Sequence, residues 1–179
     1  RSLAVNLLNR GGNKLDPFLD VAATLELQRS SNDTDVTVRV KVANNAPGGL
    51  SPYIAGPHPQ TELAEGDYLG ILAVNVPGRA VNVTIEGTGA PISSGGDGPT
   101  QVVAVSLLLS RGQETTVTVQ FRLQASQGRV SVVPSARMPA MRRTLSARSA
   151  SSIGRPAKSC TSRLQARSAA GPLPTRAAT

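Results

Sequence analysis

Apolar residues alternate with polar residues along several segments of this chain. At 36–42, four valines occupy every second position, with polar or charged residues between them. Successive side chains of a β-strand point to opposite faces, so this pattern buries one face and leaves the other in water. The same alternation recurs at 21–27 and 117–123. It predicts antiparallel strands, because parallel strands are covered on both faces and are apolar throughout.

Further segments complete an all-β pattern. Residues 69–76 and 102–109 are apolar at most positions and are bounded by turn-forming residues, which favours central strands over helices. The segment with Val81, Val83 and Ile85 alternates, so we expect these three side chains to share one face. Roughly seven or eight short strands at this spacing predict an antiparallel β-sandwich, either immunoglobulin-like or an open barrel.

Charge divides the chain near residue 137. Of nineteen Lys and Arg and eleven Asp and Glu, eleven basic and all the acidic residues lie at 1–137, so 138–179 carries the whole net charge of +8. The second segment has no aromatic residue and few large apolar ones. It cannot bury enough apolar surface to offset an ordering entropy of about 1–2 kcal/mol per residue. We expect a β-sandwich domain at 1–137 and a disordered basic tail, rich in Arg, Ala, Ser and Pro, at 138–179.

One long stretch, 44–67, lacks a strand pattern and contains four prolines. Proline has no N–H group to donate to a sheet, so this stretch predicts an ordered loop or an edge segment. Loops of this length within a compact domain are often functional. We therefore take 50–68 as the candidate contact surface. Its candidate contact residues are Tyr53, His58, Glu62, Glu65 and Tyr68.

Each of these residues also has a structural explanation. Glu62 and Glu65 could act as paired carboxylates in glycoside hydrolysis or bind calcium, but we favour an acidic loop in solvent. Tyr53 and Tyr68 could form a stacking platform for a sugar or a peptide; we favour a tyrosine hydroxyl bonded to backbone at a strand end. His58 is the one histidine of the chain, and one histidine does not make a metal site.

No residue pattern predicts catalysis. The chain has one His and one Cys, and its serines lie in no Gly-x-Ser-x-Gly motif. Lys14 and Asp16 follow a Gly-Gly pair, but the spacing of a phosphate-binding loop is absent, so we favour a turn between strands. We predict a protein that is not an enzyme and that uses no cofactor or metal.

Several sequence elements occur in a characteristic order. They are Asn6, 11–16 with Phe18, 44–50, 52–57, 77–78, 85–87, and 109–113 before 115–123. In this order they resemble the C-terminal β region of an actinobacterial envelope family catalogued as domain of unknown function four thousand and twelve. The resemblance covers about three-quarters of the chain, and its most specific elements lie at 12–16 and 49–53.

The resemblance implies a single-span protein with a large extracytoplasmic portion and no established activity. This chain is then expected to be the last third or so of such a protein, held at the membrane only through an anchor upstream of it. We expect a non-catalytic structural or ligand-contacting module in the cell envelope, whose partners are an envelope polymer or upstream domains of the same protein. The tail departs from the family pattern, and we hypothesise a frameshifted or degenerate ending from about residue 138.

A second function follows from the tail instead of the sandwich. Dispersed arginines bind nucleic acid or anionic lipid through counterion release, which needs no fold. The tail has no aromatic residues on which bases could stack. A nucleic-acid-associated protein that acts through its basic tail is therefore the alternative, and we favour the envelope module.

Overall fold

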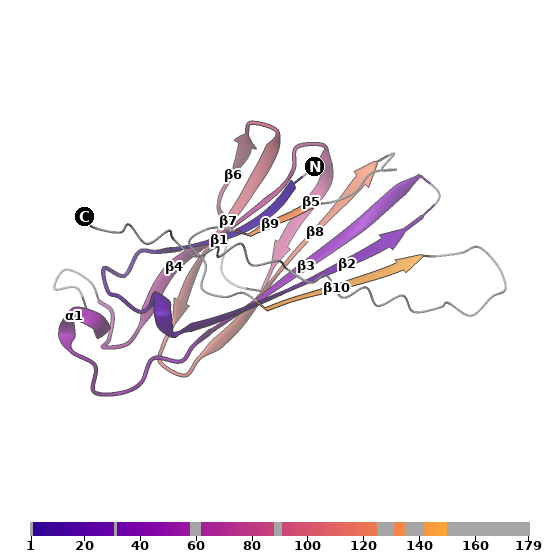
Figure 1. Ribbon diagram of the computed structural model, residues 1–179. Coiled ribbons are helices and arrows are strands. Elements are labelled where there is room, and N and C mark those ends of the chain that lie inside the picture. The colour runs from indigo at the N-terminus through magenta and orange to yellow at the C-terminus, as the bar shows by residue number, and fades with distance from the viewer. Residues whose placement is uncertain are drawn as a thin grey trace, which may run out of the picture.

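The computed structural model describes residues 2–30, 32–57, 62–87, 91–124, 131–134 and 142–149. These residues form two separate β-sheets that enclose one common core, with two short helical turns in the connections (Figure 1). The predicted all-β sandwich is therefore confirmed. No strand pair among the described residues joins the two sheets, so their arrangement is that of a two-sheet sandwich.

The first sheet, sheet A, is formed by strands that contain a single charged residue, Asp97 at the end of one of them. It contains β1 (Ser2–Asn9), β4 (Tyr68–Pro77), β6 (Pro91–Asp97), β7 (Thr100–Leu109) and β9 (Ser131–Pro134). The order is β6-β7-β4-β1-β9, and each pair is antiparallel except β1 with β9, which is parallel. The two segments predicted as central strands are β4 and β7, and each has a neighbour on both sides.

The second sheet, sheet B, is formed by the alternating segments. It contains β2 (Leu19–Arg29), β3 (Asp33–Asn44), β5 (Ala80–Glu86), β8 (Glu114–Gln124) and β10 (Arg142–Ser149). The order is β10-β2-β3-β8-β5, and only the β10–β2 pair is parallel. Strands β2, β3 and β8 are the longest of this sheet, and their full-length antiparallel pairing forms its centre.

The two helical turns lie in the connections that follow β1 and β3. They are the 3-10 turn η1 (Asp16–Phe18) and the four-residue helix α1 (Pro52–Ala55). Both begin with a proline at or next to their first residue, where its missing N–H needs no partner within the helix. Within the described residues, none of the helical segments has the length and hydropathy that crossing a membrane requires.

The core lies between the sheets and consists mainly of alternate residues of strands β1, β2, β3, β4, β7 and β8. The four valines of β3 that were predicted to face inward are at most 1% exposed, and the matching residues of β8 are at most 3% exposed. On sheet A, Leu72, Val74 and Val76 of β4 are fully buried against them. The predicted burial of every second side chain is therefore confirmed for β3 and β8.

Strand β5 departs from the predicted alternation. A bulge interrupts its pairing with β8, and Asn82 within the bulge has a left-handed φ of 54°. Val81 lies opposite exposed Arg122, on the outer face of sheet B, whereas Ile85 lies opposite a buried valine of β8. The prediction that Val81, Val83 and Ile85 share one face is wrong for Val81, because a bulge inserts a residue and shifts the alternation.

Regular structure extends past the boundary predicted near residue 137. Strand β10 pairs in parallel with β2, from Arg142 opposite Ala22 to Ser149 opposite Arg29. An open sheet edge orders a segment through backbone hydrogen bonds, which do not require apolar side chains. The segment predicted as a tail thus contributes an edge strand to sheet B, and its other residues lie outside the described part of the chain.

The outer faces of the two sheets differ in charge. Sheet B carries three cross-strand ion pairs with N–O distances of 2.7 Å: Glu26–Arg39, Lys41–Glu114 and Asp35–Arg122. In sheet A, strands β1, β4, β7 and β9 contain no charged residue, and Asp97 ends β6. Its outer face includes exposed Leu8, which pairs with Ile71, and Leu108, which is 57% exposed and pairs with Leu69.

Two leucines of sheet A test this assignment of inner and outer faces. Leu72→Ala removes a fully buried side chain and is expected to lower the free energy of unfolding by about 2–5 kcal/mol. Leu108→Ala, on the outer face, is expected to change it by less than about 0.5 kcal/mol. Urea denaturation of both variants measures the difference. Equal losses for the two leucines would contradict the assignment.

Candidate functional site

The connections at one end of the sandwich pack together into a layer, which we call the loop cap. It comprises the described residues of 10–18, 45–67 and 110–113, and it includes η1 and α1 (Figure 1). Backbone hydrogen bonds join its parts. The N–H of Lys14 donates to the carbonyl of Ile54, and the N–H of Gly66 donates to that of Ala55, each at 3.0 Å. The candidate contact loop is therefore one part of a larger bonded unit.

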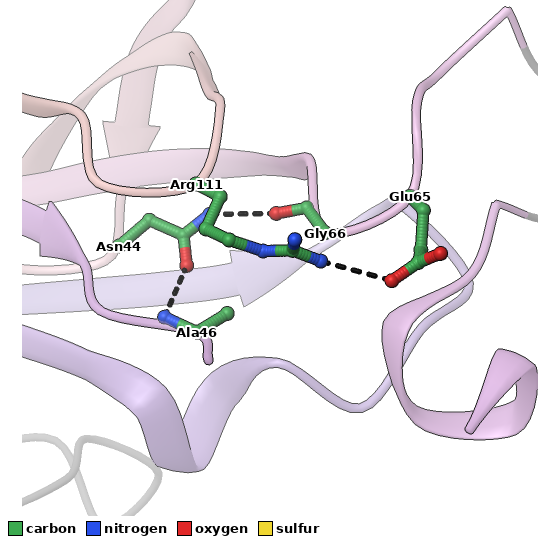
Figure 2. A network of polar contacts seen from close by, with 5 residues as sticks. All are labelled: Asn44, Ala46, Glu65, Gly66 and Arg111. Atoms are coloured by element: carbon green, nitrogen blue, oxygen red, sulfur yellow. Dashed lines mark hydrogen bonds and ion pairs between the residues drawn. The ribbon is translucent and has the colours of Figure 1, made fainter. Parts of the chain in front are cut away.

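Asn44, the last residue of β3, lies at the centre of the loop cap and is 0% exposed. Its Nδ2 donates to the carbonyl oxygens of Gly66, at 2.8 Å, and of Leu109, at 2.9 Å. Its Oδ1 accepts the N–H of Ala46 at 3.2 Å, as Figure 2 shows together with the bond to Gly66. Because Leu109 ends β7, this one side chain joins a strand of sheet B to a strand of sheet A.

The backbone of Asn44 is bonded as well as its side chain. Its N–H donates to the carbonyl of Gln113 at 2.9 Å, and its carbonyl accepts the N–H of Gly112 at 2.8 Å. A buried amide that lacks partners costs free energy, whereas this one has a partner for each of its polar atoms. Asn44 therefore serves as a structural connection and has no polar group left for a ligand.

Arg111 extends across the outside of this connection toward Glu65 (Figure 2). Its Nη2 lies 3.0 Å from the Glu65 carboxylate, and both side chains are partly exposed. Gly66 lies beneath the guanidinium with a φ of 85°, and a Cβ atom at this position would come within 2.7 Å of Arg111 Nη2. The backbone conformation at residue 66 therefore favours glycine, and a larger residue there would displace the guanidinium of Arg111.

A second polar cluster lies where β1 enters the loop cap. Asn9 Nδ2 donates to the carboxylate of Asp16 at 2.9 Å and to Oδ1 of Asn13 at 3.1 Å, and its own Oδ1 accepts the N–H of Gly11 at 2.9 Å. Asn13 is buried, and its Nδ2 donates to the carbonyl of Asp67 at 2.8 Å. This cluster connects the first loop of the chain to the start of β4.

Three carboxylates of the loop cap, those of Asp16, Glu65 and Asp67, are engaged with groups of the protein. Asp16 and Glu65 accept the bonds from Asn9 and Arg111 described above, and Asp67 Oδ2 accepts the N–H of Ala64 at 2.9 Å. Within the described ranges, no group of three or more His, Cys, Asp or Glu side chains is placed to hold a metal ion. Asp67 thus orients loop backbone, whereas Asp16 and Glu65 accept bonds from side chains.

Tyr68 begins β4 and lies beneath the loop cap with 0% of its surface exposed. Its ring lies over Gly70, where a Cβ atom would come within 2.5 Å of Tyr68 Cε1. In the part of the chain that the structure describes, its hydroxyl has no hydrogen-bond partner. Burial, with a smaller contribution from the negative charge of Asp16, raises the pKa of this hydroxyl well above its usual value.

The structure describes four of the five residues that were predicted to form a contact surface, and it separates Tyr68 from the other three. Tyr53 is 76% exposed, and Glu62 and Glu65 are exposed on the same connection. Tyr68 is buried, so the predicted stacking platform of Tyr53 with Tyr68 is wrong. Among the described residues, the Tyr68 hydroxyl also lacks the bond to backbone that we favoured. The close packing of the ring on Gly70 explains its burial. His58 lies outside the described residues.

Three residues that hold the loop cap together were not predicted as site residues. The sequence around Asn13, Asn44 and Arg111 indicates turns, because Asn side chains bond to nearby backbone and Gly lies close to each position. Asn is mostly exposed in proteins, although Asn44 continues the inward-facing series of the valines at 36–42 and Asn45 does not. The bonds of the Asn44 amide to Gly66 and Leu109 depend on segments distant in the sequence, so the local pattern does not indicate them.

A shallow pocket lies at the opposite end of the sandwich, between the turns that connect its strands. It is lined by Pro77, Gly78, Arg79, Pro99, Leu123 and Gln124. These residues include no carboxylate, imidazole or thiol, so they offer neither a general base nor a nucleophile. The loop cap is therefore the better candidate for a functional surface.

Comparison with known proteins assigns no family. A scan of the chain against protein-family models finds no match, and neither does a search of curated proteins. The resemblance to the actinobacterial envelope family therefore stays a prediction from the sequence.

Two adjacent asparagines test the role of the buried amide. Asn44→Ala leaves the buried carbonyls of Gly66 and Leu109 without their donor and is expected to lower the free energy of unfolding by at least about 2 kcal/mol. Asn45→Ala, at an exposed position, is expected to change it by less than about 0.5 kcal/mol. Urea denaturation provides both values, and similar losses for both variants would refute the structural role of Asn44.

Tyr68→Phe tests the unpartnered hydroxyl. Removing a buried group that has no partner is expected to leave the stability unchanged or to increase it by up to about 1 kcal/mol at neutral pH. Above about pH 10 the unfolded chain releases the Tyr68 proton while the folded chain keeps it, so the wild-type protein loses stability as pH rises. The advantage of the variant should therefore widen above about pH 10. Denaturation across this pH range measures it, and a destabilised variant would indicate a missing partner for the hydroxyl.

Proposed function

We propose that this chain is a non-catalytic structural module of a larger, membrane-anchored protein of the cell envelope. In this proposal the module lies outside the cytoplasm and contacts the rest of that protein through the outer face of sheet A. The observation that carries the contact through sheet A is the unequal distribution of charge between the two outer faces of the sandwich.

The outer face of sheet A has the character of a covered surface. An antiparallel sheet that faces water on one side alternates apolar with polar residues, as β3 and β8 of sheet B do. On β1, β4 and β7 the outward positions hold no charge, and they include the cross-strand pairs Leu8–Ile71 and Leu69–Leu108. Contiguous exposed apolar residues mark contact sites on soluble domains. This favours packing against another part of the same protein.

The loop cap supports a structural role over ligand binding. The polar side chains of Asn9, Asn13 and Asn44 bond to backbone or to each other, and Glu65 is paired with Arg111. A binding surface needs polar groups that are free to meet a partner. Tyr53 is the one large apolar side chain that is strongly exposed on the described part of this cap, so contact with an envelope polymer is the secondary role for this end.

The proposed location outside the cytoplasm depends on the family resemblance. The two most specific elements of that resemblance, 12–16 and 49–53, lie in the same loop cap, and Lys14 is bonded to the carbonyl of Ile54 just beyond the second element. Sequence elements that contact each other in a fold are constrained together. This gives a physical reason why 12–16 and 49–53 occur in the same chain. This contact supports the resemblance as one unit of structure.

Cysteine labelling in whole cells tests both parts of the proposal. Single cysteines replace Leu108, on the outer face of sheet A, and Gln120, which is exposed on the outer face of sheet B, with Cys160 changed to serine. In the full natural gene product, a membrane-impermeant maleimide is expected to label Gln120→Cys in intact cells and to leave Leu108→Cys unlabelled, because that face is covered. In the purified 179-residue chain, both positions are expected to react.

Each part of the proposal has its own contrary result. If Gln120→Cys reacts only after the cells are lysed, the location outside the cytoplasm is refuted. If both positions react equally in intact cells, the location stands and the covered face of sheet A is refuted. Denaturation of each purified variant verifies that the labelling reports a folded domain.

A further inference from the structure

Strand β2 of sheet B has the properties of a strand that pairs readily with a neighbour. Its eleven residues contain no proline, and they pair with β3 in continuous register, from Leu19 opposite Asn44 to Arg29 opposite Thr34. Every second residue of such a strand points its backbone N–H and C=O away from its antiparallel neighbour. A long and regular edge of this kind is a template for pairing with another chain.

Strand β10 occupies this edge of β2 (Figure 1). It pairs with eight of the eleven residues of β2, from Ala22 to Arg29, and the register has no shift along this length. By comparison, β9 pairs with four residues of β1. Among the described strands, β10 is therefore the neighbour that supplies most of the free side of β2 with backbone partners.

The register of β10 agrees with the pattern of β2. It sets Leu145 opposite Leu25, which is 6% exposed and belongs to the core, and Ala147 opposite Leu27, which packs against the core. A shift of one residue would set both apolar residues of β10 opposite polar residues of β2. The pairing is therefore specific in register and is more than a chance contact of a polar tail.

Strand β10 also changes the character of the edge that the sandwich presents. It contains Arg142, Arg143 and Arg148 and no acidic residue. Its other side has no neighbouring strand among those described. Charged residues on an edge strand oppose pairing with a further strand. A regular edge that pairs readily is thereby replaced by a basic edge that does not.

We propose that residues 142–149 act as a strap that closes the edge of β2 and keeps the chain monomeric. The strap has one neighbouring strand among those described, so it opens more easily than a central strand does. When it detaches, the edge of β2 becomes available to another chain. On this proposal, 142–149 belongs to the domain and is not part of a degenerate ending.

Hydrogen exchange followed by NMR tests whether the strap is in place. Along 22–29, alternate amides of β2 have β3 as their partner and the others have β10, so both sets are expected to be protected in the 179-residue chain. Thr144→Pro together with Leu145→Pro removes an N–H that β10 donates to β2, because successive N–H groups of a strand point to opposite sides. In this variant the amides that face β10 are expected to exchange at least about tenfold faster, and those that face β3 at the same rate as before.

Sedimentation velocity tests whether the strap keeps the chain monomeric. Cys160→Ser is included in every protein, so that no disulfide joins two copies. Over a series from low micromolar to near-millimolar protein, the chain with an intact strap is expected to stay monomeric, whereas the double-proline variant is expected to associate. At the concentrations where it associates, the exposed amides of β2 are expected to regain protection, because β2 is then paired with another chain.

Thr144→Ala together with Leu145→Ala is the matched control, since it shortens the same two side chains and keeps both backbone N–H groups. This variant is expected to remain protected and monomeric. Circular dichroism and urea denaturation verify that each variant keeps the fold.

Four results overturn the proposal. One is rapid exchange of the amides that face β10 in the chain with an intact strap, and another is a double-proline variant in which these amides stay protected. The third is a double-proline variant that stays monomeric, or that associates without renewed protection of β2. The fourth is association of the alanine control or of the intact chain to the same extent as the proline variant.

Discussion

The buried side chain of Asn44 is the connection on which this sandwich depends. Two sheets that share only apolar side chains can slide or separate at their ends, where the core is thinnest. Here one amide ends β3 of sheet B and binds the last carbonyl of β7 in sheet A, while it also binds Gly66 of the long connection. The buried amide loses water on folding, so it is stable only with all these partners in place. Closing the sandwich and ordering the loop cap are therefore one event.

The same interaction explains why polar residues of the loop cap have structural roles. Arg111 lies in the turn after β7. Its side chain covers Gly66 and forms an ion pair with Glu65. Asn13 reaches the carbonyl of Asp67 on the other side of that glycine. Arg111 and Asn13 thus bind the residues on either side of Gly66, whose carbonyl accepts the bond from Asn44. An exposed ion pair adds little stability by itself. Here the Arg111–Glu65 pair lies over the buried hydrogen bond from Asn44 to Gly66 and limits the access of water to that bond.

The sequence predicted the strands better than the connections between them. Alternation at 36–42 and 117–123 depends only on the period of a strand, so it indicated the buried valines of β3 and β8 correctly. The bulge at Asn82 was not predictable, because it depends on pairing with β8 and not on local pattern. Burial of Tyr68 and Asn44 had the same cause: each contacts residues outside its own strand. Of the candidate contact residues, only those whose exposure follows from a polar loop, such as Glu62, could be placed from sequence.

The parallel strands β9 and β10 have a consequence for how the chain folds as it is synthesised. They lie beside β1 and β2, the first strands of their sheets, with Ser2 next to Ser131 and Ala22 next to Arg142. Until the ribosome has released these late segments, the earliest strands present bare edges to any neighbouring chain. Contacts between the two ends of a chain also form slowly, because a long loop must close first. The edges of β1 and β2 are therefore completed only after residues 131–149 have been synthesised.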